Sequence, residues 1–387
     1  MQFETWWLLA VPIIFALGWM AARIDLTELL HQSKQLPRSY FNGLNFLLND
    51  QPDRAIEAFI EVVELDPETI ELHFALGSLF RRRGETERAI RVHRNLLERA
   101  DLPVEFRDEA LFSLAQDYLK AGLLDRAEAS FKQLTPTPYA PRAWHFLSEI
   151  YQIESDWPNA IHAATQVTVA VKDSSEHDVH AQIPRQLAHF WCELAQQAIA
   201  RADWSASSMA IANARKSDAK LMRIAQVEIA LAQARAETDQ ALQLINAAQK
   251  KSPDFAAQLA PLLIALEPNN HATNARRLER WFDAHASTSL VLAALEQWQA
   301  AGDRAAASTF ARRAVEKVPT LAVSAAVLNQ KLQLPAADPD LEAISAIVAV
   351  AVGRERSYEC THCGFRARQF YWQCPGCKHW ETLPYVY

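Results

Sequence analysis

Four of the five cysteines lie close together near the C-terminal end, at Cys360, Cys363, Cys374 and Cys377. They form two Cys-x2-Cys pairs separated by ten residues. Two such pairs can wrap one tetrahedral ion, with zinc–sulfur bonds of about 2.3 Å. A segment of about 30 residues is too small to fold on its apolar residues alone, so a bound ion would supply its folding energy. The spacing therefore predicts a metal-binding domain with these four ligands.

The residues around the cysteines refine this prediction. Gly364 and Gly376 are expected to supply the permissive backbone of the two turns. Four thiolates complete a tetrahedron, so His362 and His379 are expected on the surface. Six aromatic residues are expected to form a small core packed on the last helices before the domain: Tyr358, Phe365, Phe370, Tyr371, Trp372 and Trp380. The Cys-x2-Cys-Gly and Cys-Pro-Gly-Cys turns resemble a rubredoxin knuckle, which suggests iron and a redox role. The interpretation that we prefer is an isolated structural ion, either iron or zinc.

The bulk composition excludes several classes of protein. The chain has 387 residues with a net charge of −7 and no long basic run, which argues against nucleic-acid binding. Five cysteines are too few for a disulfide scaffold, and the clustered four indicate a reducing compartment. The fifth, Cys192, is expected in a helical core. No phosphate-binding loop, HExxH motif or nucleophile elbow is present, so we expect a protein that is not an enzyme.

The middle of the chain is repetitive. Ala55, Ala89, Ala127 and Ala160 are spaced by 34, 38 and 33 residues, close to the 34-residue period of tetratricopeptide helix pairs. A small residue at these places lets paired helices cross closely, and Gly84 and Gly122 suit the turn between the two helices of a pair. The pattern predicts an all-α solenoid of about seven to nine helix pairs. The repeat signal fades between residues 200 and 340, and Lys172 to Pro184 is expected to form a longer loop.

The N-terminal segment from Thr5 to Ala22 contains 18 residues without a charge. A helix of that length spans about 27 Å, which suits the apolar core of a bilayer. A cleaved signal peptide is the alternative, but the first residues carry Glu4 and no Lys or Arg. Arg23, Lys34 and Arg38 follow the segment, so the positive-inside bias predicts a single-pass anchor with the body in the cytoplasm.

These signals divide the chain into five predicted parts. They are an N-terminal transmembrane anchor over residues 1–22, a juxtamembrane linker over 23–36, the repeat solenoid over 37–335, a connecting helix over 336–355, and the rubredoxin-like four-cysteine domain over 356–387.

This order of parts resembles the lipopolysaccharide assembly protein B family of Gram-negative bacteria. The matching stretches include GLNFLL (43–48), LGSLFRRRGETERAIRVH (76–93), DYLKAGLLDRAEASFKQL (117–134), HFWCELA (189–195) and CGFRARQFYWQCPGC (363–377). The resemblance implies an inner-membrane protein that restrains lipopolysaccharide synthesis. It further implies three protein partners: the committed-step lipid A deacetylase, a membrane-bound ATP-dependent metalloprotease that degrades it, and an inner-membrane lipopolysaccharide sensor. The family's rubredoxin-type site corresponds to the four clustered cysteines.

Three functional hypotheses follow from these features. The anchor, repeats and family resemblance favour an adaptor that promotes proteolysis of the deacetylase. The same repeats would also serve a passive scaffold that gathers lipopolysaccharide-synthesis enzymes at the inner membrane. The rubredoxin-like turns alone would suit an electron-transfer protein, which requires iron that changes oxidation state.

Overall fold

The computed structural model describes residues 51–65, 70–171, 182–332, 339–354 and 358–384, with a few single positions before residue 51. Apart from Phe15 and Trp19, the predicted anchor over residues 1–22 lies outside the described residues, as does the linker over 23–36. Within the described ranges, no helix combines the length and apolar composition that a bilayer crossing requires.

The chain divides into two compact units, Met1–Tyr139 and Ala140–Tyr387. Described helices of unit 1 are α3 (Pro52–Leu65), α4 (Ile70–Arg83), α5 (Thr86–Glu98), α6 (Val104–Lys120) and α7 (Leu124–Leu134). Unit 2 contains α8 (Ala140–Glu154), α9 (Trp157–Val171), α10 (Ile183–Ala200), α11 (Trp204–Ser217), α12 (Met222–Ala234), α13 (Thr238–Lys251), η1 (Pro253–Phe255), α14 (Ala256–Leu266), α15 (His271–Ala284), α16 (Thr288–Ala300), α17 (Arg304–Lys317), α18 (Leu321–Leu332), α19 (Pro339–Arg354), β1 (Tyr358–Glu359) and β2 (Arg366–Ala367).

Helices of unit 1 pack in consecutive pairs because small residues stand where they cross. Ala89 and Ala127 are fully buried. A Cβ atom added to Gly77 of α4 would lie 2.4 Å from the His93 ring of α5, so the two helices meet too closely for any larger residue. Gly84 and Gly122 have φ angles of +86° and +75°, which confirms their predicted place in the turns.

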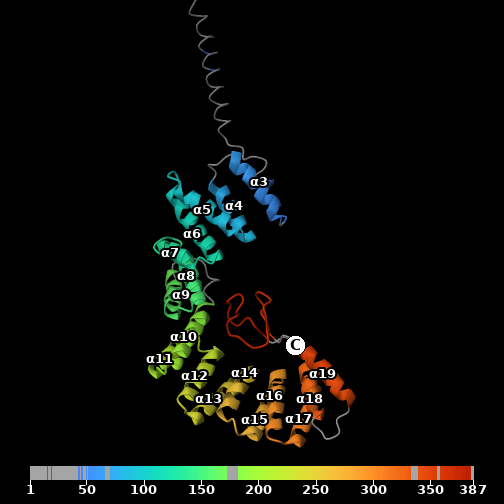
Figure 1. The fold of residues 1–387 in the computed structure, drawn as a ribbon. Helices are drawn as coiled ribbons and strands as arrows, with labels where there is room; N and C mark the ends of the chain where they lie inside the picture. The colour runs from blue at the N-terminus through green and yellow to red at the C-terminus, as the bar shows by residue number, and fades with distance from the viewer. Residues whose placement is uncertain are drawn as a thin grey trace, which may run out of the picture. The chain divides into compact units, whose positions relative to one another are not determined.

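Unit 2 continues the pairing through a row of antiparallel helices (Figure 1). In this view α12, α14 and α16 lie nearer to the C-terminal segment than α13, α15 and α17 do. Large apolar side chains fill the space between neighbouring pairs, and Phe282 and Phe310 meet edge to face with ring centroids 5.4 Å apart. Stacking between neighbours therefore provides the core, as expected for a repeat protein.

One predicted boundary is partly wrong. The loop expected from Lys172 to Pro184 lies mostly outside the described residues, but α10 begins at Ile183, so Ile183 and Pro184 are helical. Proline is tolerated in the first turn of a helix because the amide it lacks would have no partner inside the helix there.

The C-terminal domain is small and largely irregular. β1 and β2 form an antiparallel pair in which Tyr358 faces Ala367 and Glu359 faces Arg366. Its buried centre comprises Cys360, Ala367, Cys374 and Leu383. A core of so few side chains is consistent with a domain that depends on its cysteines.

Candidate metal centre

The structure brings the four predicted ligands together. The sulfur atoms of Cys360, Cys363, Cys374 and Cys377 all lie within 4.8 Å of one another. Cys360 Sγ lies 3.6 Å from Cys377 Sγ, and Cys363 Sγ lies 3.7 Å from Cys374 Sγ. Four sulfurs around one ion at about 2.3 Å are separated by about 3.8 Å along each tetrahedral edge. The observed separations fit such a tetrahedron and are far longer than a disulfide bond of about 2.05 Å.

Backbone hydrogen bonds shape the two cysteine turns in the same way. The Gly364 amide donates to the Cys360 carbonyl at 2.8 Å, and the Lys378 amide donates to the Cys374 carbonyl at 2.9 Å. Gly364 has a φ angle of +71° and Lys378 has one of +61°. The prediction for Gly364 is therefore confirmed, but in the second turn Lys378, rather than Gly376, takes the left-handed conformation.

The thiols influence one another's ionisation. Burial opposes ionisation of Cys360, but its hydrogen bond with the Thr382 hydroxyl and nearby backbone amides lower its pKa to about 6. Burial raises the pKa of Cys377 to about 12, and the neighbouring sulfurs raise it as well, because they oppose a second negative charge. A positive ion among the four sulfurs would remove this conflict, since each coordinating thiolate gains from its charge.

The two nearby histidines do not complete the sulfur cluster. His362 and His379 are exposed, as expected, and their rings stack with centroids 3.7 Å apart and planes 20° apart. One nitrogen of each ring and the Cys377 sulfur lie within 4.8 Å of one another, but that sulfur already belongs to the four-cysteine cluster. The arrangement suits a surface pair better than a pair of ligands to one ion.

The C-terminal domain docks on the middle of unit 2. Trp380 donates through Nε1 to Gln152 Oε1 of α8 at 2.9 Å, and Trp372 donates to Gln226 Oε1 of α12 at 2.6 Å. Trp372 also packs against Phe255 of η1, with ring centroids 5.5 Å apart. The prediction that these aromatics pack on the last helices is wrong, because the contacts of the two tryptophans fall on α8, α9, α10, α12 and η1. Indoles favour such places, where a ring is buried and its N–H finds an acceptor.

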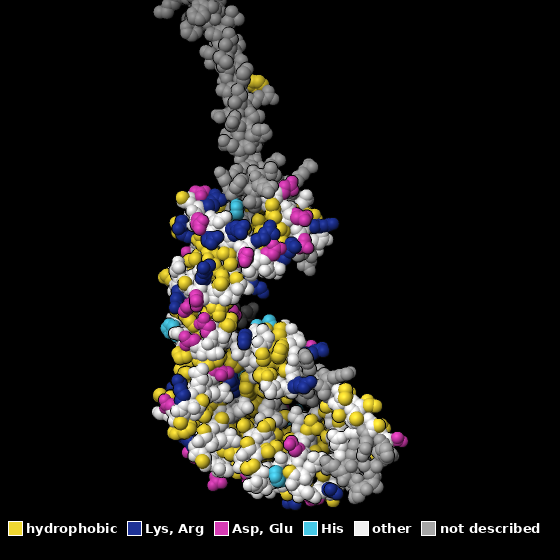
Figure 2. Space-filling model, in the orientation of Figure 1, with side chains coloured by type: hydrophobic (Ala, Val, Ile, Leu, Met, Phe, Trp, Pro, Cys, Tyr) yellow, Lys and Arg dark blue, Asp and Glu magenta, His cyan; other side chains and the backbone are white. Residues whose placement is uncertain are grey.

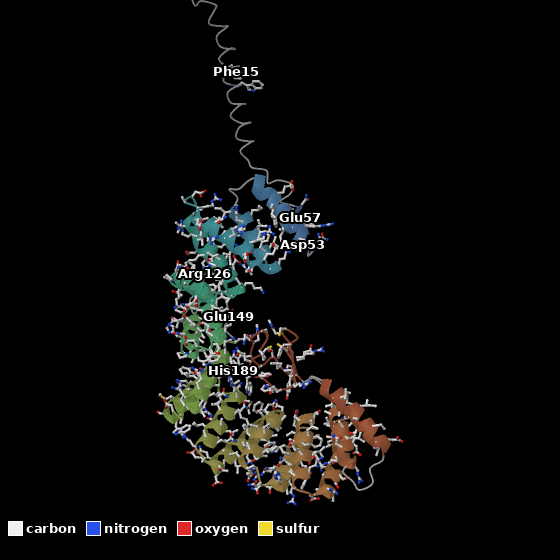
Figure 3. All side chains as sticks on the ribbon, in the orientation of Figure 1. Phe15, Asp53, Glu57, Arg126, Glu149 and His189 are labelled. Atoms are coloured by element: carbon white, nitrogen blue, oxygen red, sulfur yellow. The ribbon has the colours of Figure 1, made fainter. Side chains whose placement is uncertain are left out.

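His189 lies at the centre of this docking interface (Figure 3). Its fully buried ring stacks on Trp380 with centroids 4.4 Å apart, and its Nε2 lies 3.5 Å from Glu381 Oε1. Arg185 donates to Glu381 Oε2 at 2.5 Å, and the Arg223 guanidinium lies 5.1 Å from the centre of the Trp380 ring. One histidine, two arginines and one carboxylate therefore join α10 and α12 to the C-terminal domain.

Electrostatics at this interface favour the docked state. Burial would raise the pKa of Glu381, but the nearby His189 ring and the hydrogen bond from Arg185 outweigh it and lower the pKa to about 2. Burial lowers the pKa of His189, while Glu381 partly opposes this. The carboxylate thus stays ionised and paired.

Sequence reasoning did not single out the docking residues on the repeats. His189 lies between Ala188 and Phe190, which are both fully buried, and a polar residue in such a place was the available signal. The sequence contains no local cue that pairs it with Glu381. Cys192 is fully buried as predicted, and burial raises the pKa of its thiol to about 12.

Two family models match the two parts of this architecture. The family model described as a rubredoxin metal binding domain matches residues 358–384, and the tetratricopeptide repeat model matches residues 72–107. Among solved structures, a tetratricopeptide repeat protein from Parabacteroides merdae has a TM-score of 0.37 at 12% identity, covering 76% of this chain and 100% of that one. Yeast Tom70 has a TM-score of 0.34 at 11% identity, covering 88% and 89%.

The chain is thus a mostly helical tetratricopeptide-like solenoid that ends in a rubredoxin-type domain. Lipopolysaccharide assembly protein B of Escherichia coli strain K12 is 30% identical over 382 residues, covering 97% of this chain and 96% of that protein. The protein of that name from Haemophilus influenzae is 27% identical over 397 residues, with the same coverage. The chain belongs to the lipopolysaccharide assembly protein B family, in agreement with the prediction of a scaffold that is not an enzyme.

Proposed function

We propose that this protein is a cytoplasmic adaptor, anchored in the inner membrane, that regulates lipopolysaccharide synthesis. It holds the lipid A deacetylase near a membrane-bound ATP-dependent metalloprotease and so promotes breakdown of the deacetylase; an inner-membrane lipopolysaccharide sensor opposes it. The observation that carries this proposal is family membership over nearly the whole chain. The helix pairs support it because stacked repeats offer extended surfaces for protein partners.

The four cysteines are proposed to hold one ion, and its role is to fold the docking domain. Cys360, Cys363, Cys374 and Cys377 have the spacing and sulfur separations for either iron or zinc. The docked tryptophans favour a structural role, because an ion that folds this domain also fixes Trp372 and Trp380 against the repeats.

The proposal includes the five predicted parts of the chain. They are the anchor over residues 1–22, the linker over 23–36, the solenoid over 37–335, the connecting helix over 336–355 and the metal domain over 356–387. A single span at the N-terminus would confine the repeats to the membrane surface. Confinement raises the effective concentration of a bound substrate near a membrane protease without any new contact.

Deacetylase half-life in cells that lack the chain tests the adaptor. We expect a longer half-life, restored by the full chain and not by a chain without residues 1–22. An unchanged half-life combined with co-purification of several lipopolysaccharide-synthesis enzymes would support the passive scaffold instead. Elemental analysis of the purified protein tests the third hypothesis, because zinc alone would exclude electron transfer through this site.

A further inference from the structure

The last helix of the solenoid, α19, exposes an apolar stripe. Ile344, Ile347 and Val350 keep 49%, 70% and 56% of their surfaces exposed, and the other exposed positions between residues 343 and 350 are alanines. The opposite side of the helix is covered by α18, where the Ser345 hydroxyl donates to Asn329 Oδ1 at 2.6 Å. Figure 2 shows hydrophobic atoms at the surface over this part of unit 2. One apolar face of α19 is therefore left without a neighbour among the described residues.

The position of α19 explains why no repeat covers this face. The helix stands at the end of the row in unit 2, and α18 is its main neighbour among the helices that the structure describes (Figure 1). After α19 the chain enters the C-terminal domain rather than another helix pair. The terminal repeat of a solenoid usually presents a polar outer face, because no further repeat buries it. An apolar face at this end therefore indicates a surface that another molecule covers.

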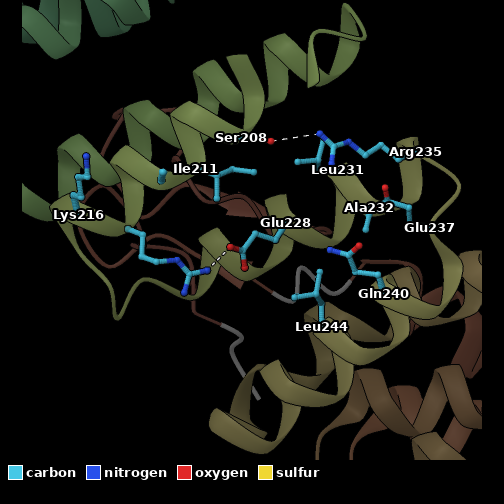
Figure 4. Close-up of a pocket in the computed structure, with 12 residues that line it drawn as sticks. Ser208, Ile211, Lys216, Glu228, Leu231, Ala232, Arg235, Glu237, Gln240 and Leu244 are labelled. Atoms are coloured by element: carbon cyan, nitrogen blue, oxygen red, sulfur yellow. Dashed lines mark hydrogen bonds and ion pairs between the residues drawn. The ribbon is translucent and has the colours of Figure 1, made fainter. Parts of the chain in front are cut away.

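An exposed surface elsewhere in unit 2 has different chemistry. The hollow of about 590 Å³ over α11, α12 and α13 is lined by charged as well as apolar side chains (Figure 4). There Arg215 pairs with Glu228, and Arg235 donates to the Ser208 hydroxyl at 3.4 Å. Charged groups with partners inside the chain let this hollow face water without a ligand. The exposed stripe on α19 consists of alanine, isoleucine and valine alone, so it lacks such groups.

The sequence of the stripe is complementary to itself when two copies of α19 run antiparallel. In a contact with two-fold symmetry, residues at equal distances on either side of the axis lie opposite each other. With the axis between Ala346 and Ile347, Ala343 of one copy lies opposite Val350 of the other, at both ends of the contact. A small residue opposite a large one lets two helices approach and interdigitate. The pattern therefore favours a second copy of this chain as the molecule that covers the stripe.

The two ends of α19 fit the same register. Asp340 stands near the beginning of the helix and Arg354 at its end, so antiparallel pairing brings positions of opposite charge side by side. A parallel pair would bring positions of like charge together. A membrane surface fits the stripe less well, because a helix that lies on a membrane carries Lys and Arg beside its apolar face. None of the exposed residues between 343 and 350 is Lys or Arg.

We propose that two copies of this chain associate through α19, packed antiparallel about a two-fold axis. Ile347 of each copy lies beside the axis, and Val350 of each packs on Ala343 of the other. One helix face is smaller than the roughly 800 Å² that each partner buries in a standard interface, so the dimer is reversible, with a dissociation constant on the order of 100 µM. This inference concerns self-association and does not depend on the adaptor proposal.

Cysteine cross-linking of the full chain, at about 100 µM in detergent solution, tests the register. One chain carries Ala343→Cys, another carries Val350→Cys, and the reagent is a short cross-linker that joins two thiols. In the antiparallel pair the two residues at position 343 lie about 10 Å apart along the helix axis, whereas positions 343 and 350 lie opposite each other. We therefore expect the mixture to give about fivefold more cross-linked dimer than either chain alone.

Further substitutions test whether the stripe itself holds the copies together. Ile347→Asp, added to both chains, should lower the yield about tenfold, because pairing would bury two carboxylates beside the axis. Val169→Asp places the same charge at an exposed apolar position of α9 and should leave the yield unchanged. The chain without an added cysteine measures any reaction of the five native cysteines. Circular dichroism checks that each variant remains helical.

Three outcomes would overturn this inference. The first is a mixture that gives no cross-linked dimer above the chain without an added cysteine. The second is an equal loss of yield in Ile347→Asp and Val169→Asp, which would mean that the stripe is not the contact. The third is a dimer that Ala343→Cys forms alone as readily as the mixture does, which would exclude the antiparallel register. If the first outcome occurs and Ile347→Asp releases the chain from vesicles of phosphatidylethanolamine and phosphatidylglycerol, the stripe faces lipid instead.

Discussion

Each unit of the molecule contains a network of arginine and carboxylate around a buried histidine, but the two networks connect different parts of the chain. In unit 1, Asp117 of α6 accepts hydrogen bonds from His93 Nδ1 of α5 at 2.5 Å and from Arg81 of α4 at 2.7 Å. Arg81 also donates to the Ser113 carbonyl at 3.1 Å. All of these groups come from three consecutive helices, so the network holds neighbouring repeats in register.

In unit 2, the corresponding carboxylate comes from far along the chain. His189 of α10 meets Glu381 of the C-terminal domain, and Arg223 of α12 donates to Glu193 at 2.6 Å. Asp117 is fully buried, whereas the Glu381 side chain keeps 26% of its surface exposed. Breaking a fully buried ion pair leaves uncompensated charge away from water, while a half-exposed pair is replaced by hydration. The same chemistry therefore stabilises the fold in unit 1 and a docked domain in unit 2.

Cys374→Ser should have the largest effect and should act on unit 2 alone. Loss of one thiolate from the proposed site removes most of its metal affinity, which for structural zinc reaches about 10 kcal/mol. We expect loss of the bound ion, by elemental analysis, and rapid proteolysis of the C-terminal domain, by mass spectrometry. Without a folded domain, Glu381 no longer meets His189, while the Asp117 network is unaffected. Cys192→Ala is the control and should keep the ion; a Cys374→Ser tail as resistant as the original would contradict the metal-folding argument.

Asp117→Asn should have the next largest effect, now in unit 1. It keeps the side-chain shape but leaves Arg81 and His93 without their charged partner, at a cost of about 3 kcal/mol in the free energy of unfolding. Urea unfolding followed by circular dichroism measures this change. Asp125→Asn, at an exposed position of α7, should cost about 0.5 kcal/mol or less. Equal stability of the two variants would show that the network in unit 1 does not hold the repeats together.

Some features of the two units could be predicted from the sequence, and others could not. The repeats were predictable because Ala55, Ala89, Ala127 and Ala160 are buried by contacts with their own neighbouring helices, at spacings close to the 34-residue repeat length. The four cysteines were predictable for the same reason, since both pairs lie on short turns. The docking of Trp380 on His189 was not predictable, because two surfaces so far apart in the chain are matched by shape and burial rather than by spacing. Lys378 was missed because the local pattern favoured a glycine for its backbone conformation.

Trp380→Ala should release the C-terminal domain without unfolding it. The indole stacks on His189, bonds to Gln152 and lies under Arg223, so its loss should weaken docking by about 2 kcal/mol. Hydrogen exchange should increase in α8, α10 and α12, while elemental analysis still finds the ion. Met209→Ala, at an exposed position of α11, should leave both unchanged. If the ion were lost together with docking, the domain and its interface would be one cooperative unit rather than two.

Acidification should have the smallest effect and should distinguish the histidine of the docking interface from its carboxylate. Burial lowers the pKa of His189 below 6.5, so docking is fully stabilised above that pH and weakens as the pH falls toward the lowered value. The pKa of Glu381 is lowered from 4.5 to about 2, so its contribution is present above 4.5 and is lost only in stronger acid. Between pH 7 and pH 5 we therefore expect a modest loss of protection of the α10 amides, measured as the exchange rate relative to the intrinsic amide rate at each pH and caused by His189.

His189→Gln should flatten the part of this profile between pH 7 and pH 5, because the substituted amide does not titrate. The charged groups that face His189 are Glu381 from the C-terminal domain, Arg185 from α10 and Arg223 from α12, and none of them has an ordinary pKa in this range. Elemental analysis at each pH separates undocking from loss of the ion. Tighter docking at pH 5 than at pH 7 would mean that His189 is protonated when it pairs with Glu381, and the interface would then rest on an ion pair rather than on a buried neutral ring.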